Sequence, residues 1–122
     1  MENWILTDDS SAQYLQKVDD FTFNCIDTVL MPWDAYMVCY TQIDIRDYSL
    51  DELENELCPY CHTLDEICRD YGVRDAIQII VECIFENTLF IDMEWTKEFS
   101  AEEEAIAFIE AYVKEESENE TH

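Results

Sequence analysis

The sequence predicts an α+β fold: a single compact domain in which about three antiparallel strands pack against four to five helices. Three observations lead to this prediction. The 122 residues are 48% hydrophobic and 13% aromatic, which is enough apolar material for a core. The single glycine and the two prolines favour helices over tight turns. Segments with helical periodicity alternate with segments that have the two-residue period of a strand.

The first part of the chain is predicted to supply one helix and two strands. Ser10 is a candidate N-cap, and the apolar spacing after it predicts a short helix over 10–19. Alternation of apolar and polar residues predicts a strand over 21–25. A dense run of β-branched and aromatic residues predicts another over 36–45. Pro32 disfavours continued pairing in the connection between these two strands.

Helices are predicted through the middle of the chain. Ser49 and Glu52 have the spacing of a capping box, and three leucines behind them (Leu50, Leu53 and Leu57) are expected to face inward. A second helix is expected over 63–72, with Tyr71 on its inner side, and Gly72 is placed at its end. A third is expected over 73–86 as the central core helix, with a strand as the alternative.

The last part of the chain is predicted to form a strand and a helix. Residues 89–99 alternate in polarity like a half-buried strand. The segment 100–103 resembles a capping box and begins a helix that is expected to run to Lys114. The domain is therefore expected to span 1–114, and the acidic segment 115–122 is expected to be a frayed tail.

Charge is the most unusual property of this sequence. Thirty Asp and Glu face six Lys and Arg, which gives a net charge of −24 and a pI of about 4.1. A net charge of magnitude about 2–8 suffices for the solubility of a small domain. Nucleic acids and anionic membranes are excluded as direct partners because they would be repelled. A basic partner is expected: a nucleic-acid-binding protein, a polycation or divalent metal ions.

The amino terminus has no basic region followed by an apolar run, and no apolar run in the chain approaches membrane-spanning length. We therefore expect a cytoplasmic protein whose six cysteines are mostly reduced.

The tetrapeptide 58–61, Cys-Pro-Tyr-Cys, resembles the active-site motif of glutaredoxins, and His62 extends it to the attachment motif of c-type haem. In glutaredoxins the motif begins a helix, which lowers the pKa of the first cysteine. Here Cys58 is expected near the end of a helix and among carboxylates, which disfavours a thiolate. Zinc is another interpretation, with Cys58, Cys61 and Cys68 as ligands and His62, Cys83 or another cysteine as the fourth. Reduced structural cysteines are the preferred interpretation.

Catalytic constellations are not evident in the sequence. The two histidines, one of them the terminal His122, offer little material for a triad, and a single glycine cannot form a phosphate-binding loop. We expect neither an enzyme nor a bound cofactor.

The predicted contact surface for the basic partner consists of outward carboxylates at short, regular spacing. Side chains four residues apart on a helix lie about 5–6 Å apart at Cβ, and those two apart on a strand about 6.7 Å. DNA carries one charge per about 3.4 Å of each strand. The predicted contact residues are Asp44, Asp47, Asp51, Glu52, Glu54, Glu56, Asp65, Glu66, Asp70, Asp92 and Glu94.

In size, charge, helical acidity and aromatic content, the whole chain resembles the small acidic DNA-mimic inhibitors of phages and mobile elements, the anti-CRISPR and anti-restriction proteins. Those proteins share no motif, so no individual site residue is transferred. The resemblance implies a stoichiometric inhibitor that occupies the nucleic-acid-binding channel of a defence nuclease. The alternatives are an immunity protein that neutralises a nuclease toxin, and a zinc or redox cysteine module. Monomer and dimer are both compatible with the sequence.

Overall fold

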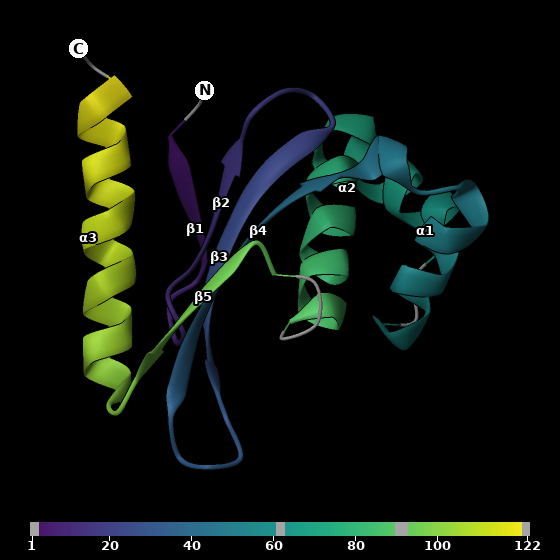
Figure 1. The fold of residues 1–122 in the computed structure, drawn as a ribbon. Helices are drawn as coiled ribbons and strands as arrows, with labels where there is room; N and C mark the ends of the chain where they lie inside the picture. Colours follow the sequence, from purple (N-terminus) through teal and green to yellow (C-terminus); the bar gives the residue numbers. More distant parts are fainter. Residues whose placement is uncertain (1–2, 61–62, 90–92, 121–122) are drawn as a thin grey trace.

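The structure is a computed structural model, and it describes residues 3–60, 63–89 and 93–120, with the side chains of 116–120 left aside. This part of the chain forms a single α+β domain with three layers (Figure 1). The strands are β1 (Trp4–Asp8), β2 (Gln13–Lys17), β3 (Thr22–Leu30), β4 (Tyr36–Asp44) and β5 (Trp95–Phe99). The helices are α1 (Leu50–Leu57), α2 (Leu64–Thr88) and α3 (Glu102–Glu120), and short 3-10 turns lie at Ile45–Asp47 and Cys58–Tyr60.

The five strands form one antiparallel sheet in the order β1-β2-β3-β4-β5. The first four are joined directly to their neighbours in the sequence. Both α1 and α2 are inserted between β4 and β5, which pair with Tyr40 opposite Trp95 and Tyr36 opposite Phe99. The insertion places α1 and α2 on one face of the sheet, and α3 lies along the other face (Figure 1).

Each face of the sheet has its own apolar core. Toward α2, the buried side chains of Leu15 and Phe23 pack with Ile84 and Phe85. Toward α3, the buried core includes Ile26, Val38, Ala105 and Ile109. Aromatic rings extend this second core, and the rings of Tyr40 and Trp95 stack with their centroids 5.1 Å apart. Burial on both faces explains why the central strands β2 and β3 are almost continuously buried.

The prediction of a helix over 10–19 is wrong. Ala12 has a φ of 60°, in the left-handed region, and the chain then enters β2. In β2, Leu15 and Gln16 point to opposite faces and both are buried, which the helical interpretation did not anticipate. Strand β1 was not predicted either, although its Trp4 contributes to the core under α3. The described chain therefore has five strands and three α-helices, in place of about three strands and four to five helices.

The helices predicted over 63–72 and 73–86 are both present, joined as α2. Gly72 interrupts the helical geometry with φ 80° and ψ 158°, a conformation that glycine adopts readily. The strand predicted over 89–99 is only partly correct: α2 continues to Thr88, β5 begins at Trp95, and 90–92 lie outside the described residues. Helix α3 continues past Lys114 to Glu120.

Candidate functional site

Helix α1 is held firmly to the rest of the domain. The hydroxyl of Ser49 accepts a hydrogen bond from the Glu52 N–H (3.1 Å), and the Glu52 carboxylate accepts one from the Ser49 N–H (2.9 Å), which confirms the predicted capping box. Leu53 and Leu57 are buried against α2, with Leu57 completely inaccessible to solvent. Leu50 was expected to face inward as well, but it lies in the first turn and is 73% exposed.

The predicted contact carboxylates differ in their exposure. Seven are exposed: Asp47, Asp51, Glu52, Asp65, Glu66, Asp70 and Glu94. Three are half-buried, namely Asp44, Glu54 and Glu56, and Asp92 lies outside the described residues. Most of the exposed group lies on α1 and on the first half of α2, so the structure brings much of the predicted set to one side of the molecule.

The half-buried carboxylates hold neighbouring elements together. Glu54 in α1 accepts a hydrogen bond from the Leu64 N–H at the start of α2 (3.1 Å). Glu56 accepts one from the amide of Asn87 near the other end of α2 (2.7 Å). Asp44 pairs with Arg46, and the hydrogen bonds from Arg46 lower the pKa of the Asp44 carboxyl to about 2. These side chains are therefore occupied in the fold and less available to a partner.

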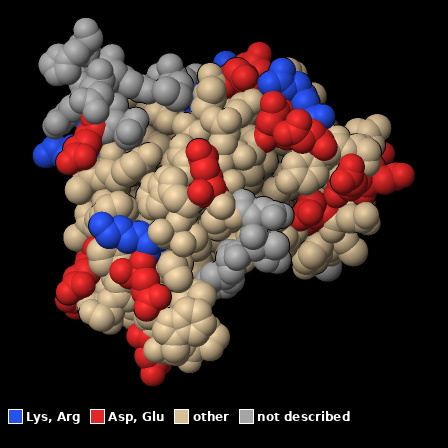
Figure 2. All heavy atoms as spheres, viewed as in Figure 1, with Lys and Arg blue, Asp and Glu red and all other residues tan. Residues whose placement is uncertain are grey.

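Four exposed carboxylates define what we call the α1–α2 acidic surface: Asp51, Glu52, Asp65 and Glu66. Asp70, also exposed on α2, is left out because it pairs with Arg69. Asp51 and Glu52 lie in the first turn of α1, and Asp65 and Glu66 in the first turn of α2. All four are exposed and none forms an ion pair with a described residue. Figure 2 shows acidic side chains on the side where α1 lies and others at the lower left of the view, with mostly uncharged described residues between them.

Glu94 belongs to a different part of the molecule. It directly precedes β5, the edge strand of the sheet, where its N–H donates to the Tyr40 carbonyl at 2.8 Å. Asp92, its predicted companion on the strand, lies outside the described residues. The predicted pairing of Asp92 with Glu94 along a strand therefore stays a prediction, and Glu94 itself lies just before β5.

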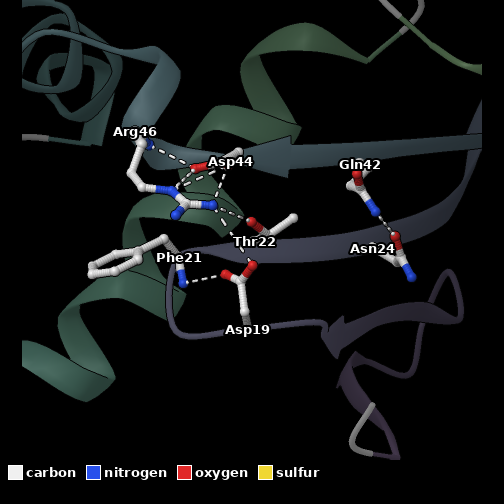
Figure 3. A network of polar contacts seen from close by, with 7 residues as sticks. All are labelled: Asp19, Phe21, Thr22, Asn24, Gln42, Asp44 and Arg46. Carbon is white, nitrogen blue, oxygen red and sulfur yellow. Dashed lines mark hydrogen bonds and ion pairs between the residues drawn. The ribbon is translucent and has the colours of Figure 1, made fainter.

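A polar network that sequence reasoning missed fixes one end of β3 and β4 (Figure 3). Arg46 contacts the carboxylates of Asp44 (2.7 Å) and Asp19 (3.6 Å) and the hydroxyl of Thr22 (3.4 Å). Asp19 also accepts a hydrogen bond from the Phe21 N–H (2.8 Å), which is the main reason why its pKa is lowered. The contacts of Arg46 with Asp44 and of Phe21 with Asp19 are local, but those of Arg46 with Asp19 and Thr22 join segments distant in the sequence, which no local pattern reveals.

A second carboxylate cluster was also missed, because it forms between β3 and α2. The amide of Gln13 donates hydrogen bonds to the carboxylates of Asp27 (3.0 Å) and Glu86. Beside it, a cavity of about 250 Å³ is lined by Gln13, Glu82, Cys83 and Glu86, together with Thr7, Asp8, Tyr60 and Ile79. Asp27 is only 4% exposed, and its burial raises the pKa of the carboxyl to about 6.

The Asp27 carboxyl predicts a pH dependence of stability. Because its pKa is about 6 when folded and about 3.9 when unfolded, the folded state binds the proton more tightly. Lowering the pH from 7.5 to 5 should therefore raise the free energy of unfolding by about 1–1.5 kcal/mol through this group. Urea denaturation at both pH values measures the gain. Asp27→Asn should remove this contribution, whereas the exposed Asp9→Asn should retain it; an equal pH response in all three proteins would contradict the assignment.

The cysteines do not assemble into a site in the described chain. Cys58 is exposed where α1 ends, Cys68 is half-buried in α2, and Cys61 and His62 lie outside the described residues. Burial raises the pKa of the Cys83 thiol to about 11, so it stays protonated near neutral pH and is a poor nucleophile. Among the described residues, no three His, Cys, Asp or Glu side chains are grouped so that they could hold a metal ion.

No helix within the described ranges is both long enough and apolar enough to cross a membrane. Comparison of the chain with protein-family models, with curated proteins and with solved structures found no match.

Proposed function

We propose that this protein is a stoichiometric inhibitor that imitates the charge of a nucleic-acid backbone and blocks the nucleic-acid-binding groove of a basic nuclease or defence complex, as anti-CRISPR and anti-restriction proteins do. The observation that carries the proposal is the α1–α2 acidic surface on a chain with a net charge of −24. Its carboxylates lie on helices that are anchored by Leu53, Leu57 and Ile67, all of which are buried.

Anchoring matters because a rigid surface binds without the entropic cost of ordering a flexible acidic tail. The capping box at Ser49 and the hydrogen bond from Leu64 to Glu54 fix the starts of α1 and α2, where the carboxylates lie. A cationic groove attracts such a surface over long range, which speeds association at low salt. The inhibitor then excludes DNA or RNA because it contacts the same basic side chains in the groove of the partner.

Capture of the partner tests this proposal. The immobilised protein is exposed to lysate from bacteria that carry active defence systems, and retained proteins are eluted with increasing salt and identified. We expect a basic, nucleic-acid-binding nuclease to be retained at low salt and released well below 1 M, because the contact is between charges. Retention that is unchanged from low to near-molar salt would contradict the proposed charge-based contact.

A second candidate is an immunity protein that neutralises a nuclease toxin, and exposed apolar side chains favour it. In the same part of the chain, Tyr71 is 57% exposed and Tyr60 is 38% exposed, although Tyr71 was predicted to face inward. Aromatic side chains commonly provide most of the binding energy at protein interfaces. An immunity protein of this kind would keep much of its affinity at high salt and lose it with Tyr71→Ala.

A further inference from the structure

Basic residues are scarce in this protein, yet two of its six Lys and Arg line the same hollow. Lys17 from β2 and Arg74 from α2 border a cavity of about 410 Å³ and an adjoining one of about 240 Å³. Other cations are already engaged: Arg46 pairs with aspartates, and Lys97 lies 4.7 Å from the centroid of the Phe108 ring. The two cavities together form what we call the Lys17–Arg74 pocket.

The rest of the larger cavity is mainly apolar. Phe21, Phe23, Val73 and Ile77 line it, and Asp20 is its one carboxylate. The smaller cavity shares Lys17, Phe23 and Arg74 with it and adds Ile5, Gln78 and a second carboxylate, Asp75. Val73 and Arg74 directly follow Gly72, whose positive φ interrupts α2. The interruption therefore places the pocket beside the first turn of the second half of α2, where the partial positive charge of a helix start favours anions.

The two cations are weakly engaged by the protein itself. Arg74 forms no ion pair or side-chain hydrogen bond with any described residue, although the chain contains 30 Asp and Glu. The Lys17 side chain is only 16% exposed, and it pairs at 3.4 Å with Asp20, whose own side chain is 81% exposed. One contact with a carboxylate at 3.4 Å leaves other N–H donors of the Lys17 ammonium group available, so the group can also contact a bound anion.

We propose that the Lys17–Arg74 pocket binds a small organic anion, with an aromatic or aliphatic body and a carboxylate or sulfonate head. The head would contact Lys17 and Arg74, and the body would pack on Phe21, Phe23 and Ile77. A volume of about 410 Å³ is within the usual range for small-molecule sites, about 300–1,000 Å³. Larger polyanions such as nucleic acids are disfavoured by the surrounding negative charge. This site is separate from the α1–α2 acidic surface and does not depend on the function proposed for it.

The probe for this site is 8-anilinonaphthalene-1-sulfonate, whose fluorescence increases in apolar surroundings. We expect saturable binding of one molecule per protein, and an affinity that falls about tenfold in Arg74→Gln and in Lys17→Gln, as is typical for the loss of one charge-assisted hydrogen bond. Arg69→Gln is the matched control. It changes the net charge by the same amount as Arg74→Gln, and Arg69 also lies on α2, with a side chain that is 71% exposed. The affinity of the Arg69→Gln variant for the sulfonate should stay within about twofold of that of the unmodified protein.

Two further measurements separate specific binding from its alternatives. Arg74→Lys should restore most of the affinity, because it returns the cation to the pocket. The uncharged analogue N-phenyl-1-naphthylamine should bind more weakly than the sulfonate, and equally in Arg74→Gln and in the unmodified protein. The proposal is overturned if the sulfonate does not bind, if Arg69→Gln weakens it as much as Arg74→Gln does, or if the uncharged analogue binds as tightly. Thermal unfolding of each variant checks that the fold is kept.

Discussion

Leu57→Ala is expected to lower the free energy of unfolding by about 2–5 kcal/mol, which is the usual cost of emptying a buried leucine site. Leu57 is completely inaccessible to solvent and lies in the core between α1, α2 and the sheet. The loss of stability has two parts. The deleted methyl groups no longer bury apolar surface, and a cavity remains because the surrounding helices cannot move together to fill it. Urea denaturation at neutral pH measures it without changing the ionic strength.

The matched control is Leu50→Ala, on the same helix. Leu50 is 73% exposed, so its truncation should change the free energy of unfolding by no more than about 0.5 kcal/mol. If the two substitutions have equal effects, α1 is not anchored as described. Because the carboxylates of α1 depend on this anchoring, Leu57→Ala should also weaken binding of the captured partner at temperatures where the variant remains folded.

Neutralising the α1–α2 acidic surface should weaken partner binding by about 3- to 150-fold at low salt. The triple variant Asp51→Asn, Asp65→Asn and Glu66→Gln removes three exposed charges whose side chains form no ion pair with described residues. An exposed ion pair contributes about 0.2–1 kcal/mol, so three contribute about 0.6–3 kcal/mol. Titration of the captured partner at several salt concentrations measures the loss, which should diminish as salt is added.

A second triple variant controls for net charge and for helix position. Glu102→Gln, Glu103→Gln and Glu104→Gln change the charge by the same amount and also lie in the first turn of a helix, on the opposite side of the sheet. This variant should bind the partner nearly as well as the unmodified protein. Equal weakening in both triples would mean that only the total charge matters, and no weakening in either would exclude the α1–α2 acidic surface as the contact.

Local signals in the sequence were sufficient for several elements. The capping box at Ser49 and the helix break at Gly72 are each determined within a few residues, and the structure confirms both. Strand β2 was missed because its strand pattern is weak: Leu15 and the polar Gln16 are both buried, on opposite faces of the sheet. Only pairing with β1 and β3, which is not local, selects the strand.

In the candidate site, the sequence was sufficient to predict which helix carboxylates are exposed, but not which ones contact other elements. The exposure of Asp51 and Glu66 follows from the capping pattern and the apolar stripe of each helix. The engagement of Glu54 and Glu56 with α2 depends on how the two helices pack, which the sequence alone did not indicate. The buried Asp27 was hidden for the same reason, since its partner Gln13 lies on β2 and Gln13 in turn donates to Glu86 of α2.

Competition with DNA tests the central proposal most directly. The partner recovered by capture is bound to a labelled DNA duplex, and the unmodified protein is then added at increasing concentration. We predict complete displacement of the duplex at a stoichiometry near one inhibitor per binding site, with the acidic-surface triple variant requiring about 3- to 150-fold more protein. A ternary complex in which the partner holds both the duplex and this protein would contradict mimicry of nucleic acid.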